Sequence, residues 1–123
     1  MKHFKLFVSL MVLVTTGVLG QDCALGMGGS DPEQIVEVFE LDDFQQDRMQ
    51  FWIEALEKEN APLQQQLDSL LSTHPQETPE ELTALGQKYE EIKERMVGNS
   101  LRYDQLLLGI FRPGQYRKYE ALC

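Results

Sequence analysis

Two long stripes of apolar residues constrain this chain more than any other feature. Each repeats every three or four positions apart from one gap, which is filled by Asn60 in the first stripe and Asn99 in the second. The first stripe comprises Met49, Ile53, Leu56, Leu63, Leu67 and Leu70. The second comprises Leu82, Leu85, Tyr89, Ile92, Met96, Tyr103, Leu106 and Ile110. This spacing gathers apolar side chains on one side of an α-helix. The sequence therefore predicts two long helices, over residues 43–73 and 79–110.

A polar segment, residues 72–78, separates the two stripes. Thr78 and Glu81 have the spacing of a capping box, and Pro79 fits the first position of a helix. A short connection makes consecutive helices antiparallel neighbours. The sequence therefore predicts a long antiparallel helical hairpin, within which Pro62 is expected to kink the first helix.

Short amphipathic segments at residues 32–39 and 115–122 predict two flanking helices. No segment of the mature chain shows strand-like alternation, so the predicted fold class is all-α. A hairpin only two helices thick cannot bury wide apolar stripes by itself. We expect it either to fold the flanking helices against the pair or to form a dimer.

The N-terminal segment, residues 1–20, has the features of a secretory signal peptide. Lys2 and Lys5 precede an almost wholly apolar run over residues 6–19. This run is too short for a stable membrane span, which argues against a membrane anchor. Cleavage after Gly20 predicts a flexible glycine-rich leader over residues 21–31 and a single helical domain over residues 32–123. The expected location is the periplasm, or the exterior where no outer membrane exists.

The predicted mature chain is strongly acidic. Loss of Lys2 and Lys5 leaves nine of the 11 basic residues beside all 20 acidic ones, which gives a formal net charge of −11. Such a surface repels the phosphates of nucleic acids and anionic lipids. We therefore expect no nucleic-acid partner and no stable membrane insertion after cleavage.

The two cysteines, Cys23 and Cys123, lie near the two ends of the mature chain. In an exported protein an even pair of cysteines favours a disulfide over a metal site. The interpretation we favour is an intramolecular bridge, and a bridge between two copies is the alternative.

Enzymatic signatures are missing from the sequence. His74, the one histidine of the mature chain, falls in the predicted turn, and no glycine-rich phosphate loop follows a strand. The carboxylates lie at helix caps or on exposed helix faces, without a pocket to shift their pKa values. We therefore expect a protein that is not an enzyme and holds no cofactor and no specific metal. The alternative is a regulator that senses a cation through acidic residues such as Glu54, Glu57 and Glu59.

An internal echo brackets the predicted hairpin. Each copy places an apolar residue and a glutamine four positions later at the start of an amphipathic run. The echo consists of Leu41, Asp42 and Gln45 in the first copy and Phe111, Pro113 and Gln115 in the second. Asp42 and Gln45 also form a capping-box pattern.

These paired motifs resemble the Leu-Thr-x-x-Gln motifs of the Spy/CpxP family of bacterial periplasmic proteins. Asp42 stands at the threonine position of the first motif and can also cap a helix, whereas Arg112 stands there in the second and is a poor cap. The resemblance implies a curved hairpin that forms a cradle-like homodimer. It also implies a role in the envelope stress response, as a chaperone-like protein that binds an unfolded client or a regulatory protein. The acidic charge departs from the basic cradles of the chaperone-like members.

Several large apolar residues near the open end of the hairpin are not needed for its seam. The candidate binding surface consists of Phe44, Phe51, Trp52, Leu107 and Leu108. An exposed patch of this kind could hold a polypeptide or a second subunit. The alternative is that the flanking helices cover part of it.

Overall fold

The computed structural model describes residues 23–123, and the signal peptide predicted over residues 1–20 lies outside them. The described part is all-α, as predicted. Its helices are α1 (Glu33–Phe39), α2 (Asp43–Thr73), α3 (Pro79–Leu108) and α4 (Pro113–Leu122).

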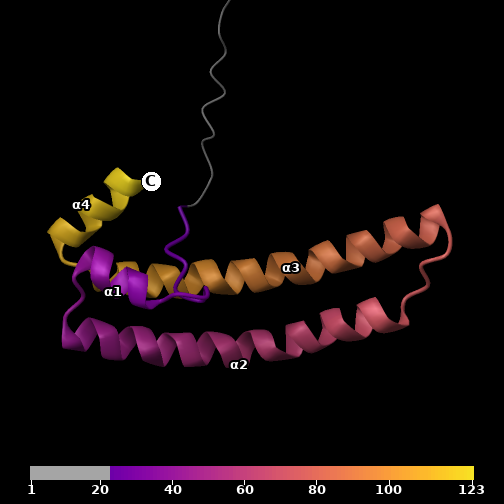
Figure 1. Ribbon diagram of the computed structural model, residues 1–123, viewed down its shortest axis with the longest axis horizontal. Coiled ribbons are helices and arrows are strands. Elements are labelled where there is room, and N and C mark those ends of the chain that lie inside the picture. The colour runs from indigo at the N-terminus through magenta and orange to yellow at the C-terminus, as the bar shows by residue number, and fades with distance from the viewer. Residues whose placement is uncertain (1–22) are drawn as a thin grey trace, which may run out of the picture.

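Helices α2 and α3 lie side by side and run in opposite directions from the connection at residues 74–78 (Figure 1). The capping box predicted for α3 is present: Thr78 Oγ1 accepts a hydrogen bond from Glu81 N at 3.2 Å, and Glu81 Oε2 accepts one from Thr78 N at 3.4 Å. Helix α2 continues as one helix through Pro62. Helices α1 and α4 lie at the end of the pair opposite the connection (Figure 1).

The predicted end of the second long helix was two residues too late. Helix α3 ends at Leu108 with Gly109 as its C-cap, and the N–H of Ile110 bonds to the carbonyl of Leu107 in a tight turn. This turn lets α4 begin at Pro113, since proline suits the first position of a helix.

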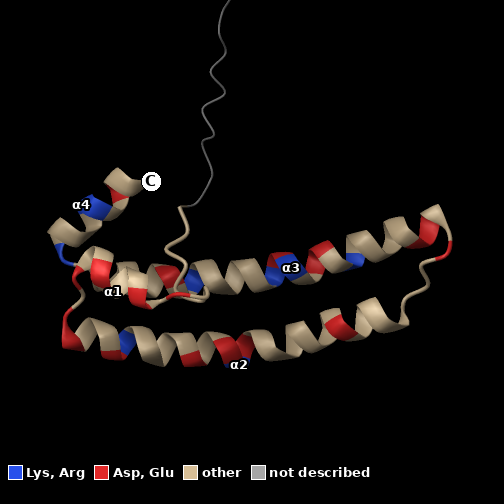
Figure 2. Cartoon of the chain, in the orientation of Figure 1, with Lys and Arg blue, Asp and Glu red and all other residues tan. Residues whose placement is uncertain are grey.

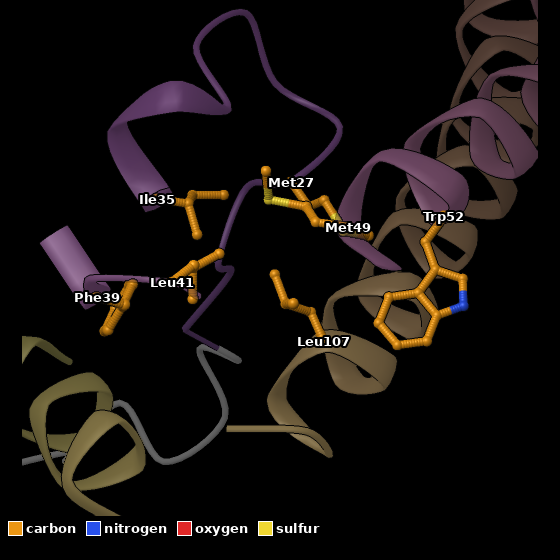
Figure 3. Close-up of a cluster of buried hydrophobic side chains, with 7 residues drawn as sticks. All are labelled: Met27, Ile35, Phe39, Leu41, Met49, Trp52 and Leu107. Atoms are coloured by element: carbon orange, nitrogen blue, oxygen red, sulfur yellow. The ribbon is translucent and has the colours of Figure 1, made fainter. Parts of the chain in front are cut away.

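The main core lies at the open end of the pair, where α1 and the N-terminal segment add a third layer to α2 and α3. Its buried members come from all of these elements. They are Met27, Ile35, Phe39, Leu41, Met49, Trp52 and Leu107 (Figure 3). Only three further apolar side chains in the described part are buried, namely Leu56, Leu67 and Leu85.

The half of the pair near the connection is thinly packed as a result. Leu82, which the stripe placed in the seam, is 52% exposed. The prediction was wrong there because a two-helix pair provides a contacting surface on only one side of each helix.

The N-terminal segment, residues 23–31, is packed against the helices, which differs from the flexible leader that we expected. The side chain of Met27 is fully buried. The backbone N–H groups of Gly26 and Met27 donate to the two carboxylate oxygens of Asp104 in α3, each at 3.1 Å. Gly26 has a φ of +80°, a conformation that glycine adopts without strain.

Burial raises the pKa of Asp104 above its usual value, although the N–H groups of Gly26 and Met27 oppose this shift. Folding therefore favours the protonated form. The contribution of this residue to the free energy of unfolding is fully present below the ordinary aspartate pKa and falls as the pH rises through the raised pKa.

We expect Asp104→Asn, which cannot titrate, to remove this part of the pH dependence. The difference in unfolding free energy between the parent and the variant should grow as the pH is lowered from about 7 to about 3. Urea denaturation across this range measures it. A difference that shrinks on acidification would show that the hydrogen bonds outweigh burial and that the pKa of Asp104 is lowered.

Cys23 and Cys123 form an intramolecular disulfide, as favoured from the sequence. The sulfur atoms are 2.01 Å apart and the Cα atoms 5.6 Å apart. The bond joins the N-terminal segment to the end of α4.

Over residues 23–123, none of the helices combines the length and the apolar character needed to span a bilayer.

Candidate functional site

The two glutamines of the internal echo meet in the interior of the protein. Gln45 is 2% exposed and Gln115 is 7% exposed. Gln45 Nε2 donates to Gln115 Oε1 at 2.7 Å, and Gln115 Nε2 donates to Gln45 Oε1 at 3.0 Å. The two side-chain amides therefore form a reciprocal pair.

Each glutamine of this pair also bonds to the backbone at two points. Its oxygen accepts the N–H of the residue three positions earlier, Asp42 for Gln45 at 3.1 Å and Arg112 for Gln115 at 2.8 Å. Its amide nitrogen donates to a carbonyl at 2.9 Å, that of Ile110 for Gln45 and that of Phe39 for Gln115. Each side-chain amide thus uses two donors and two acceptor positions, its full capacity.

Further contacts join the segment before α2 to the segment before α4. The guanidinium of Arg112 donates to Asp42 Oδ2 at 2.6 Å, and the rings of Phe39 and Phe111 lie 5.0 Å apart between centroids. The arrangement joins the start of α2 to the start of α4. Because neutral amides neither titrate nor act as nucleophiles, we assign this pair a structural role.

The echo residues are thus placed together, but one feature was missed. The sequence identified Gln45 and Gln115 as the glutamines of the two motif copies, each near a helix start, and did not predict that they bond to each other. The signal was available, because two copies of one motif flanked a pair of antiparallel helices. Leu41, the apolar residue of the first copy, is buried in the core, and Phe111 is half-buried against it.

A second feature is an exposed face of α2 at the open end of the pair. Phe44 is 63% exposed and Phe51 is 58% exposed. The guanidinium of Arg48 lies over the ring of Phe51 at 5.2 Å and over that of Trp52 at 5.1 Å. Large apolar rings exposed beside a cation favour contact with another molecule.

A groove between α2 and α3 lies on the same face, nearer the connection. It encloses about 700 Å³, and its lining includes Pro62 of α2 and Lys88 and Arg95 of α3. Eighteen residues, five full helical turns, separate Phe44 from Pro62 and likewise Lys88 from Leu106. The groove, the exposed rings and Leu106, which is 43% exposed, therefore share one side of the pair.

We call this side the open face. It is defined by Phe44, Arg48, Phe51, Pro62, Lys88, Arg95, Arg102 and Leu106. The N-terminal segment covers the other side, where Gly28 and Gly29 line a hollow with Ile53 of α2. Ile53 is nine residues from both Phe44 and Pro62, which places it on the opposite side of the helix.

The structure divides the predicted apolar surface. Phe44 and Phe51 are exposed and lie on the open face, whereas Leu108 is half-buried. Trp52 and Leu107 are buried in the core because α1 and the N-terminal segment pack there, which agrees with the alternative that part of this surface is covered.

Charge is unevenly distributed over the helices. Acidic residues follow the whole length of α2 and α3, whereas basic residues are fewer and lie mainly on α3 and α4 (Figure 2). Arg102 donates to Glu59 of α2, and this hydrogen bond holds the pKa of Glu59 below its usual range.

Within the described residues, no three His, Cys, Asp or Glu side chains gather closely enough to hold a metal ion. His74 caps the end of α2, and its Nδ1 lies 2.8 Å from the carbonyl oxygen of Pro75.

No protein-family model, curated protein or solved structure matches this chain.

Proposed function

We propose that this protein is an exported, non-enzymatic binding protein that holds unfolded or partner polypeptides on its open face. The observation that carries the proposal is the exposure of Phe44 and Phe51 on the side of the pair that the N-terminal segment leaves uncovered. Apolar rings of this size contribute most to the energy of protein interfaces when a partner buries them.

The remainder of the open face supports a polypeptide as the ligand. An extended chain or an amphipathic segment can place apolar side chains on the aromatic end and follow the groove toward Lys88 and Arg95. Lys88 and Arg95 share the groove with Glu91, so its lining offers partners for both signs of charge on a client. The resemblance of the echo motifs to those of Spy/CpxP proteins adds the periplasm and the envelope stress response to the proposal.

The proposal includes a homodimer, because the connection-side half of the pair has few buried residues and a second copy could cover it. Sedimentation velocity at several protein concentrations measures this state. The alternative of a cation-sensing regulator has no specific observation behind it, and we propose the binding function alone.

We expect the parent protein to suppress the aggregation of a thermally unfolded enzyme, and Phe44→Ser/Phe51→Ser to weaken this activity about tenfold, since interface aromatics are commonly worth 1.4 kcal/mol or more. Light scattering of malate dehydrogenase at increasing molar ratios measures the effect.

The matched control is Leu71→Ser/Leu82→Ser, which removes apolar side chains that are 47% and 52% exposed near the connection. Because these residues lie on the half that a second copy is proposed to cover, sedimentation velocity first establishes that the control keeps the oligomeric state of the parent. With that state unchanged, the control should protect as well as the parent. Failure of the parent to protect at several-fold molar excess would refute the binding function. Equal protection by the two double variants would remove the open face as its site.

A further inference from the structure

The N-terminal segment is held in place by a small number of contacts. Two are the hydrogen bonds from Gly26 and Met27 to Asp104, and a third is the burial of the Met27 side chain. The hydroxyl of Tyr119 donates to the carbonyl of Cys23 at 2.6 Å. Leu25 also packs against the core. The covalent attachment is the disulfide from Cys23 to Cys123.

This disulfide is accessible from solvent. Cys123 is exposed at the end of α4, and Cys23 is half-buried. A hollow of about 220 Å³ lies beside the bond and is lined by Cys23, Leu108, Tyr116 and Tyr119 among others. Thiol–disulfide exchange requires access for an attacking thiolate, and Cys123, an exposed residue, is the partner of the bond that offers it.

We propose that the Cys23–Cys123 disulfide is a redox-controlled clamp, which a dithiol reductant opens to release residues 23–29 from α3. A thiolate of the reductant attacks Cys123 Sγ, and Cys23 leaves as a thiolate that takes up a proton. The second thiol of the reductant then displaces Cys123 and closes the disulfide of the reductant. Two electrons and two protons pass from the dithiol to the cysteines.

The released segment is limited by the contacts that remain. The glutamine pair holds the start of α4 to α2, and Lys118 Nζ donates to the carbonyl of Val38 in α1, so α4 stays attached after reduction. On the other side, residues 23–29 keep their non-covalent contacts with Asp104 and Tyr119 but lose the covalent link to Cys123, so Met27 is then held by non-covalent contacts. Its departure uncovers Leu107 and Met49, its neighbours in the core (Figure 3).

The clamp differs from the binding function in its evidence and in its test. It depends on the N-terminal segment and α4, whereas the open face lies on the other side of the pair. The readout is amide hydrogen exchange by NMR on the oxidised mature protein, before and after addition of dithiothreitol.

We expect reduction to accelerate exchange at Gly26 and Met27 on the order of tenfold or more, because local opening then requires no covalent constraint. The backbone N–H of Gln45, which donates to Asp42 Oδ1 at 2.8 Å, should keep its protection against exchange. Cys23→Ser/Cys123→Ser without reductant should reproduce the reduced protein, and oxidised dithiothreitol should change nothing.

Two outcomes would overturn the clamp. Unchanged exchange at Gly26 and Met27 after reduction would mean that Asp104 and the burial of Met27 suffice to hold the segment. Loss of protection throughout α2 and α3 would mean that the bond supports the whole fold.

Discussion

Replacing Gln45 by alanine is expected to lower the free energy of unfolding by about 4 kcal/mol, because one truncation leaves several buried groups without partners. Gln115 loses both hydrogen bonds to its neighbour, and the carbonyl of Ile110 loses its donor. The N–H of Asp42 loses its capping acceptor as well. Urea denaturation followed by circular dichroism measures the loss.

The control for Gln45 is Gln50→Ala in the same helix. Gln50 is exposed and bonds only weakly to Glu54, at 3.3 Å, so its truncation should change stability by no more than about 0.5 kcal/mol. A loss as large as that of Gln45→Ala would contradict the buried pair as the cause, because alanine has a higher helix propensity than glutamine and propensity cannot account for a loss.

A double-mutant cycle tests whether the two glutamines act as a unit. Gln45→Ala and Gln115→Ala each leave the other side chain unpaired, whereas the double variant leaves neither. The double variant should therefore be more stable than the sum of the single losses predicts, by about 1–3 kcal/mol. Additive losses would contradict the reciprocal pair.

The second large effect is expected at Leu107. This side chain is fully buried among Met27, Met49 and Trp52 (Figure 3). Leu107→Ala should lower the free energy of unfolding by about 3 kcal/mol, which combines the lost transfer energy with the cost of a cavity. Thermal and urea denaturation both measure it.

The neighbouring residue provides a matched control for Leu107. Leu106 has the same side chain in the same helix, but it is 43% exposed on the open face. Leu106→Ala should cost no more than about 1 kcal/mol, because little cavity forms at an exposed position. Similar losses for the two variants would mean that Leu107 is not a core residue.

These neighbours also show where sequence reasoning succeeds and fails. Leu106, Leu107 and Leu108 are consecutive leucines that point to three different sides of α3. An apolar pattern alone therefore does not show which of them faces the core. The stripe pattern placed Leu106 in the seam and Leu107 on the surface, and the structure reverses the two. Leu107 is buried because α1 and the N-terminal segment pack over it as an extra layer. Periodicity within one helix carries no information about that layer.

The helix starts were predictable for the opposite reason. A capping box depends on residues three positions apart, so Thr78 with Glu81 and Asp42 with Gln45 could be identified locally. Both are present in the structure. The bond between Gln45 and Gln115 spans 70 positions, and a local pattern cannot show whether two distant caps meet.

The sequence by itself determined the all-α class and the starts of the two long helices, and it favoured pairing Cys23 with Cys123. The helices rest on local spacing, and the disulfide on an even number of cysteines in a chain predicted to be exported. Only the tertiary structure decided that Gln45 bonds to Gln115, that Met27 is buried and that Phe44 and Phe51 remain exposed. The physical reason is that burial and hydrogen bonding between distant segments depend on which layers pack together, and a spacing of three or four residues describes one helix at a time.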